Sequence, residues 1–213
     1  MSDLELGSMS VEGFCDELAS DSPTPGGGAV GAIEGAAAAA LIAMVGRLTI
    51  GKDGFADLDD RMRQLVETAD AARDDFLVLA DRDAHAFDSV MEAFAMAKVT
   101  DEQKVARSAA IQAGYLAAAS VPQEVAHKAV DLMELAEDAT ALGNPQAASD
   151  GVSAAASLYS AALCAMANVQ INAASLKDRS ARDAMVDELA ALRDRADQLL
   201  ADAHTAFHLR ITG

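Results

Sequence analysis

The chain has 213 residues and a formal net charge of −18, which arises from 34 acidic and 16 basic side chains. This charge argues against a nucleic-acid partner, because binding to a phosphate backbone depends on Lys and Arg, and equally against an anionic membrane surface. Hydrophobic residues make up 52% of the chain but aromatic residues only 4%, so the apolar content is mostly Ala, Leu, Val and Met, which largely favour helices. We expect one all-α domain over residues 1–213, an antiparallel bundle of about seven helices.

The chain divides where Pro, Gly and Asn cluster, and no intervening segment has the alternating pattern of a strand. The clearest breaks lie at 22–28 and 51–54. A capping-box pattern at Thr100 and Gln103 begins one helix, and Pro122 is expected to begin the next. Helices are expected at about 11–19, 29–49, 57–99, 101–119, 122–142 and 148–176, and from about 178 almost to the C-terminus.

Several features bear on the setting of the protein. The first ten residues lack the basic and apolar regions of an export signal, and Cys15 and Cys164 are too few for a disulfide framework, so we expect a cytoplasmic protein with two reduced, buried thiols. The apolar run between Glu34 and Arg47 is shorter than the roughly 20 residues of a membrane span and predicts a core helix. Many Asp and few Lys residues indicate a halophilic source. Ala-rich helices bury modest area per residue, so we expect a homodimer or a higher symmetric assembly.

Asp83 interrupts the apolar stripe of the third expected helix, which includes Phe76, Phe87 and Val90. A carboxylate on a core-facing stripe is desolvated, which raises its pKa and suits it to proton transfer near neutral pH. His85 is two residues further on and faces nearly the opposite way. The alternative is that Asp83 pairs with an Arg or caps a neighbouring helix.

A loop rich in Pro and Gly precedes the second expected helix. Gly26, Gly28 and Gly31 formally match G-x-G-x-x-G, but a dinucleotide fingerprint follows a strand and this chain is expected to have none. Three consecutive glycines nevertheless expose backbone N–H groups at a helix start, which predicts a site for an anion or a carbonyl group. Lys52 is a candidate partner for an acidic ligand, or else a solvated loop lysine. The loop residues are Ser22, Pro23, Thr24, Pro25, Gly26, Gly27 and Gly28.

Polar residues also mark the sixth expected helix. Asp150, Asn168 and Asn172 fall on one face, with small residues between them. A small-residue groove with amides at one end could hold a flat heterocycle, or it could be a close helix contact with satisfied amides. Asn144, in the break before this helix, is either a turn residue or a ligand contact.

No metal site is expected. His204 and His208 share a helix face, but the sequence between them lacks the glutamate of H-E-x-x-H, and no other ligand cluster accompanies them. Neither cysteine lies in a recognisable nucleophile context.

The Pro-Gly loop followed by an Ala-rich helix resembles the cyclodeaminase/cyclohydrolase family of folate enzymes. The resemblance covers nearly the whole chain, and the spacing of the loop is its most specific part. One departure is His85, where related sequences often carry an acidic residue. The other matching segments are Met44-Val45, Leu48-Thr49 with Lys52, Asp83-Ala84 with Ala86-Phe87, Pro122, Asn144, Asp150, and Asn168-Val169 with Asn172.

The resemblance implies an all-helical dimer that binds tetrahydrofolate derivatives, with Asp83 as the catalytic carboxylate and without a metal or redox cofactor. Two reactions fit. A chain without a formiminotransferase domain favours hydrolysis of 5,10-methenyltetrahydrofolate to 10-formyltetrahydrofolate, and the alternative is the cyclodeaminase reaction, which releases ammonia from a formimino group. A non-catalytic folate-binding or scaffold module is the lesser alternative.

Overall fold

A computed structural model describes residues 5–212, and over these residues it contains helices and no strand. Short 3-10 turns lie at Leu6–Ser8, Ala56–Leu58 and Pro145–Ala147. The expected all-α bundle is therefore confirmed. The α-helices are α1 (Val11–Leu18), α2 (Gly27–Thr49), α3 (Asp59–Ala86), α4 (Asp88–Ala95), α5 (Asp101–Leu142), α6 (Ala148–Ala173) and α7 (Arg179–Thr212).

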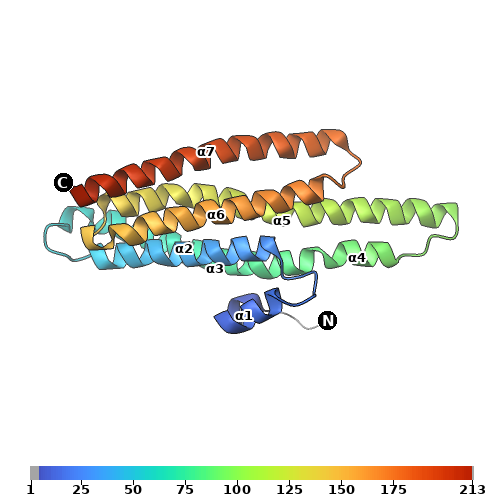
Figure 1. Ribbon diagram of the computed structural model, residues 1–213, viewed down its shortest axis with the longest axis horizontal. Helices are drawn as coiled ribbons and strands as arrows, with labels where there is room; N and C mark the ends of the chain where they lie inside the picture. Colours follow the sequence, from blue (N-terminus) through green and yellow to red (C-terminus); the bar gives the residue numbers. More distant parts are fainter. Residues whose placement is uncertain (1–4, 213) are drawn as a thin grey trace.

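The five long helices lie side by side in an elongated bundle (Figure 1). The helices in closest contact are α2 with α3, α2 with α6, and α5 with α6. Helix α4 and the first part of α5 extend beyond the others and form a tip at one end, on the right of Figure 1. The C-terminus lies at the opposite end.

Small residues let α2 and α6 approach each other closely. Gly31 faces Ala161 so tightly that an added Cβ would lie 2.9 Å from the Ala161 carbonyl oxygen. Ala154, Ala161 and Ala165, on α6, are fully buried. Most of the expected small-residue groove is therefore a close helix contact, as a densely packed interior requires. Only its amide-bearing end opens into a cavity.

Two expected boundaries are wrong. The helix expected at 57–99 ends at Ala86, and α4 begins after Phe87. The break expected at Pro122 is absent, because α5 runs without interruption from Asp101 to Leu142 with Pro122 buried inside it. A proline inside a helix leaves the carbonyl four residues earlier without its N–H donor, and in this helix a side chain from α6 supplies the missing donor.

Two apolar helices are longer than the apolar run that the sequence suggested. Helices Gly27–Thr49 and Pro145–Ala173 are long and apolar enough to cross a membrane, but 61% and 50% of their most apolar windows are buried within the bundle. Burial of this kind is typical of core helices, and no membrane partner is indicated.

Cys15 is exposed and Cys164 is half-buried, so the expectation of two buried thiols is wrong.

Candidate active site

The start of α2 presents free backbone amides. Gly26 precedes the helix in an extended conformation, and the first helical hydrogen bond runs from the Val30 N–H to the Gly26 carbonyl (3.0 Å). The N–H groups of residues 27–29 therefore have no acceptor within the helix. The Ala29 N–H donates to the Asp83 carboxylate. The glycine loop thus directs the positive end of the α2 dipole at a carboxylate.

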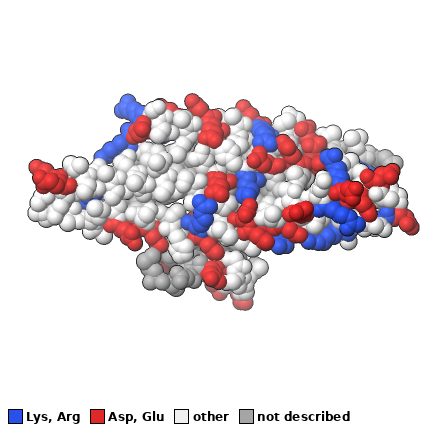
Figure 2. Space-filling view, turned by 180° about the vertical axis from the view of Figure 1, so that it is seen from behind, with Lys and Arg blue, Asp and Glu red and all other residues white. Residues whose placement is uncertain are grey.

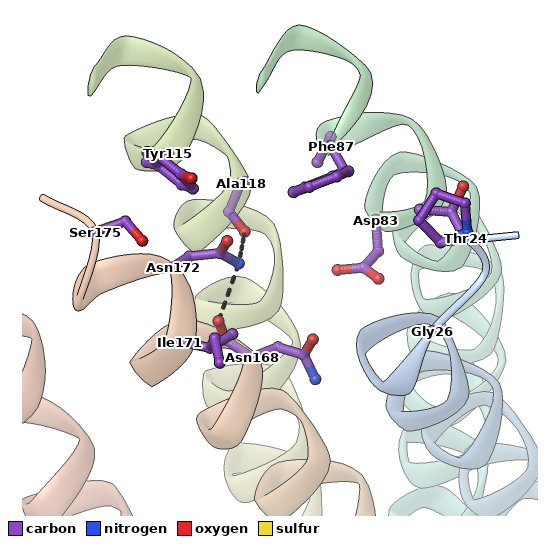
Figure 3. Close-up of a pocket in the computed structure, with 12 residues that line it drawn as sticks. Thr24, Gly26, Asp83, Phe87, Tyr115, Ala118, Asn168, Ile171, Asn172 and Ser175 are labelled. Carbon is purple, nitrogen blue, oxygen red and sulfur yellow. Dashed lines mark hydrogen bonds between the residues drawn. The ribbon is translucent and has the colours of Figure 1, made fainter. Parts of the chain in front are cut away.

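Asp83 lies in the last turn of α3, half-buried, with its carboxylate turned into a cavity (Figure 3). Burial raises its pKa from 3.8 to about 6, and the hydrogen bond from Ala29 opposes this rise. Gly28 makes the arrangement sterically allowed, because any Cβ there would overlap the carboxylate. No ion pair of Asp83 occurs within residues 5–212, so the alternative of a structural Arg partner finds no support. The other half of that alternative agrees with the structure, because the hydrogen bond from Ala29 makes Asp83 a cap for the start of α2.

Asn168 and Asn172, on α6, face Asp83 across the cavity (Figure 3). The Asn168 Nδ2 donates to the Cys164 carbonyl (2.8 Å), and the Asn172 Nδ2 donates to the carbonyls of Asn168 (3.0 Å) and Ala118 (3.1 Å). Because both amide NH2 groups are used in this way, the two side-chain carbonyl oxygens are left to accept hydrogen bonds from a ligand.

Pro122 explains how Asn172 is held. In a regular helix the Ala118 carbonyl would accept from the N–H of residue 122, but proline has no N–H. The freed Ala118 carbonyl accepts from the Asn172 side chain instead. The proline inside α5 therefore supplies an anchor for a polar side chain of α6, which the sequence pattern did not reveal.

These groups surround a cavity of about 300 Å³, which is at the small end of the range for ligand sites. Six of the expected site residues line it, and aromatic and apolar side chains that were not expected at the site complete the lining. Tyr115 could have been singled out from the sequence, because the chain has only two tyrosines. The lining residues include Pro23, Thr24, Gly26, Asp83, Phe87, Tyr115, Ala118, Asn168, Ile171, Asn172 and Ser175.

The remaining loop residues are close by. Gly27 and Gly28 sit against Asn168 and Asp83, respectively, where an added Cβ would contact those side chains. Ser22 is exposed, and its hydroxyl donates to the Thr24 carbonyl (2.6 Å), which fixes the shape of the loop. Pro25 is buried and follows a cis peptide bond.

Three expected site residues lie elsewhere. Lys52 follows the C-terminal end of α2, Asn144 precedes α6, and Asp150 is in the first turn of α6. The axis of α2 is about 33 Å long from Gly27 to Thr49, so these residues are at the opposite end of the bundle from Asp83. Asn144 is a buried turn residue, whose Oδ1 accepts from the Gln146 N–H (3.1 Å).

The histidines lie outside the cavity. His85 is exposed and its Nδ1 lies 3.5 Å from the Asp88 carboxylate, so it faces away from Asp83 as expected. His204 and His208 are exposed on α7. In the part of the chain that the structure describes, no group of three potential ligands could hold a metal ion.

Residues 10–191 match the family described as formiminotransferase-cyclodeaminase. The chain belongs to this family. It is 38% identical to a methenyltetrahydrofolate cyclohydrolase of Methylorubrum extorquens over 91% of this chain and 93% of that protein. It is 36% identical to a formimidoyltransferase-cyclodeaminase of Mus musculus over 79% of this chain, but the match spans only 31% of that longer protein.

A solved structure of this family confirms the fold. The formiminotetrahydrofolate cyclodeaminase of Thermotoga maritima superimposes with a TM-score of 0.86 and 32% sequence identity, and the match covers 97% of this chain and 100% of that one. The resemblance stated from the sequence is thereby confirmed. Family members with two different reaction names match this chain, so the name alone does not choose between the reactions.

Proposed function

We propose that this family member hydrolyses 5,10-methenyltetrahydrofolate to 10-formyltetrahydrofolate, with Asp83 as the catalytic residue. The observation that carries the proposal is a half-buried carboxylate, with its pKa raised to about 6, that faces a cavity and has no cationic partner within residues 5–212. The cyclohydrolase from Methylorubrum extorquens supports this choice, because it matches this chain over nearly the full length of both.

The reaction requires one proton to be moved twice. Asp83, ionised at neutral pH, takes a proton from a water molecule as the water oxygen bonds to the amidinium carbon between N5 and N10. The protonated Asp83 then gives this proton to N5 as the carbon–N5 bond breaks. The hydroxyl loses its own proton to solvent, and the formyl group stays on N10. No atom changes oxidation state, so the proposed reaction needs no redox cofactor.

The cavity offers groups that fit the rest of the substrate. The side-chain carbonyl oxygens of Asn168 and Asn172 suit the N–H donors of a pterin ring. Tyr115 and Ile171 present aromatic and apolar surface to an aminobenzoyl ring. The cationic amidinium would lie beside the Asp83 carboxylate, which favours the ionised form needed for the first step.

The cyclodeaminase reaction is the second candidate, because the structurally similar protein from Thermotoga maritima carries that name. In this reaction N10 closes onto a 5-formimino carbon, and Asp83 protonates the departing ammonia. Both reactions pass through one tetrahedral carbon that bridges N5 and N10, so the same carboxylate could serve either.

The decisive experiment follows the absorbance of methenyltetrahydrofolate with the purified protein, beside a separate assay for ammonia from the formimino substrate. We expect enzyme-dependent decay that Asp83→Asn lowers by at least about 10²-fold. Asp88→Asn, on the neighbouring helix α4, is the matched control and should retain activity. Ammonia release without decay would move the assignment to the cyclodeaminase, and silence in both assays would favour a non-catalytic folate-binding module.

We further propose that the protein is a homodimer that buries the outer faces of α2 and α6. Between Gly27 and Gly46 the only charged residue is Glu34, and α6 has none from Gly151 onward, although 23% of the chain is charged. Ala40 and Ala167, on these helices, are exposed. One Glu34 carboxylate oxygen is buried without a hydrogen-bond partner among the described residues. A second copy of the chain would cover this surface.

Light scattering tests the dimer. The wild-type protein should have the mass of two chains, and Ala40→Glu should shift it toward one chain, because a charge would be buried in the interface. Ala190→Glu adds the same charge on the exposed side of α7 and should leave the mass unchanged. A wild-type protein that is monomeric at micromolar concentration would contradict the proposal.

We also infer a reducing and salt-rich cytoplasmic setting. The exposed Cys15 and the half-buried Cys164 are unpaired thiols, and acidic side chains outnumber basic ones by 34 to 16. Molar salt would screen the repulsion among these carboxylates. Thermal unfolding in 0.1 M and 2 M KCl should show a higher Tm in the concentrated salt.

A further inference from the structure

Pro122 is the one proline that lies inside an α-helix of residues 5–212. A proline in a helix interior lowers the stability of the helix, because it removes one backbone hydrogen bond and its ring crowds the preceding turn. In α5 this destabilising residue occurs beside the cavity that contains Asp83. The carbonyl that it leaves without a donor belongs to Ala118, which lines that cavity.

The Ala118 carbonyl needs a donor from outside its own helix. Ala118 is only 4% exposed, and a buried carbonyl without a donor is destabilising. The Asn172 side chain supplies the donor, with its Nδ2 3.1 Å from the Ala118 oxygen. The other acceptor of Nδ2, the Asn168 carbonyl (3.0 Å), already accepts a backbone N–H in the regular pattern of α6. The carbonyl that Pro122 frees is therefore the acceptor that depends on the Asn172 side chain.

These two contacts determine which way the Asn172 amide is turned. Both neighbours of Nδ2 are carbonyl oxygens, which accept hydrogen bonds and cannot donate them. A turned amide would place its own oxygen against these two carbonyls, so the chemistry of the neighbours allows one orientation. In that orientation Nδ2 is used by the protein and Oδ1 remains to accept a hydrogen bond from a ligand in the cavity that Asn172 lines.

Neutral groups must orient a ligand in this cavity, because charged groups are scarce around it. Asp83 is the one charged residue among those that line the cavity in the described part of the chain. Figure 2 shows that acidic and basic side chains crowd the half of the back face near the C-terminal end, and that the half toward the tip is mostly uncharged. A ring that binds beside Asp83 is therefore oriented by hydrogen bonds with neutral amides.

We propose that Pro122 is a positioning residue, which fixes the Asn172 carbonyl oxygen as an acceptor in the cavity and so makes the site bind a pterin ring through one of its N–H groups. This inference rests on the proposed folate chemistry, because the pterin ring supplies the N–H donor. With an N–H at position 122, the Ala118 carbonyl would accept from its own helix. The Asn172 amide would then lose the partner that fixes its orientation, and its oxygen would meet the ligand in only part of the molecules.

Pro122→Ala tests the proposal, because it restores the backbone donor of α5 and changes no side chain that lines the cavity. We expect KM for methenyltetrahydrofolate to rise about fivefold, the effect of one weakened hydrogen bond. The change in kcat should stay below about twofold, because the ring is held equally in the substrate complex and in the transition state. The urea midpoint should not fall, since alanine favours a helix far more than proline does. A weaker KM in a protein of undiminished stability distinguishes a positioning role from a structural one.

Asn172→Ala identifies the residue through which Pro122 acts. In the Asn172→Ala background, Pro122→Ala should have no further effect on KM, because the amide to be positioned is gone. In an Asn168→Ala background the rise in KM should persist. Asn172→Ala should also lower the urea midpoint more in the wild type than in the Pro122→Ala variant, because the buried Ala118 carbonyl lacks a donor only while the proline is present.

Two further variants separate the missing N–H from the shape of the proline ring. Pro122→Ala made with a backbone ester in place of the amide at position 122 again lacks the N–H, and it should restore the wild-type KM. Pro145→Ala is the matched control, because it removes a proline from the 3-10 turn before α6, at the opposite end of the bundle, and it should leave KM unchanged. An unchanged KM in Pro122→Ala overturns the inference, and so does a rise that persists in the Asn172→Ala background or in the ester variant.

A measurement without turnover separates this inference from the proposed reaction. NMR of the 15N-labelled protein reports the side-chain NH2 pair of Asn172, which is assigned by its loss in Asn172→Ala. Pro122→Ala should shift this pair and speed its exchange with solvent, and it should weaken the binding of 5-formyltetrahydrofolate, a stable folate, about fivefold. If these changes occur and neither folate substrate is turned over, the positioning role stands and the proposed reaction fails. Turnover by Pro122→Ala with the wild-type KM and an unshifted NH2 pair would overturn the positioning role and leave the proposed reaction in place.

Discussion

The two ends of α2 both carry polar groups among apolar helices, but they use them differently. At the C-terminal end, the Thr49 hydroxyl donates to the Val45 carbonyl (2.7 Å) and accepts from the Asn144 N–H (2.8 Å). Both residues are buried. At the N-terminal end, the Asp83 carboxylate and the carbonyl oxygens of Asn168 and Asn172 face an open cavity.

The difference shows which polar residues support the fold and which are available to a ligand. A buried polar group with protein partners stabilises one structure. A polar group with an unused acceptor that faces a cavity lowers the stability of the fold. Binding of a ligand or a transition state to that acceptor can offset this loss. The expected site residues divide along this line, and substitutions at the two ends should have opposite effects on stability and activity.

The largest contrast is expected between two glycines. Gly28→Ala would place a methyl group against the Asp83 carboxylate, and the displaced carboxylate should lower kcat on the order of 10²-fold. Gly151→Ala, near the other end, would place a methyl group 2.9 Å from the Thr140 backbone and should cost about 1–3 kcal/mol of stability with kcat retained. Steady-state kinetics and urea unfolding of both variants check this. Equal loss of activity in the two would break the contrast between the ends.

The next effect concerns the stability cost of Asp83. Its pKa is raised from 3.8 to about 6 in the folded protein, so the protonated form is favoured by folding. The stability that this protonation contributes is fully present below pH 3.8 and is lost as the pH rises through 6. At neutral pH the loss of unfolding free energy amounts to up to about 3 kcal/mol. Asp83→Asn should therefore unfold at higher urea than the wild type at pH 7.5.

The same comparison at pH 4 is the control, because the advantage of Asp83→Asn should nearly vanish there. A variant that is less stable than the wild type at pH 7.5 would show that the hydrogen bond between the Asp83 carboxylate and the Ala29 N–H stabilises the fold by more than burial of the charge costs. That result would return Asp83 to the group of residues that support the fold.

The sequence predicted the fold class and the catalytic candidate because both follow from local patterns. Asp83 breaks an apolar stripe, and three glycines before an Ala-rich helix mark an exposed helix start. The sequence could not predict at which end of the bundle each polar residue lies relative to the cavity. Lys52, Asn144 and Asp150 were therefore grouped with Asp83. That grouping depends on tertiary contacts.

The helix boundaries were predicted incorrectly for a related reason. A proline usually marks a helix start. At Pro122, however, the Asn172 side chain donates to the Ala118 carbonyl that the proline leaves without a donor, and α5 continues. The cationic lining of the second cavity, of about 430 Å³, was not predicted, because Lys177 follows α6 and meets Lys98 and Arg107 only where the end of α6 packs against the start of α5.

A smaller effect is expected at the satisfied end. Thr49→Val keeps the shape of the side chain but leaves the buried Asn144 N–H without its acceptor, which should cost about 1–3 kcal/mol of unfolding free energy. Thr140→Val is the matched control, because that hydroxyl bonds only to the Ala136 carbonyl of its own helix (2.7 Å) among the described residues. Urea unfolding should rank Thr49→Val as the less stable, with kcat unchanged in both. A fall in kcat for Thr49→Val alone would mean that this end contributes to catalysis.

The smallest effect is expected for Lys52→Gln. Lys52 is exposed beyond the C-terminal end of α2, about 33 Å of helix away from the glycine loop. We therefore expect kcat and KM for methenyltetrahydrofolate within twofold of the wild type. A tenfold rise in KM would mean that the far end of the partner subunit reaches the site in a dimer. In that case Ala40→Glu, which should separate the subunits, would raise KM by a similar factor, and the two ends of α2 would serve one composite site rather than separate tasks.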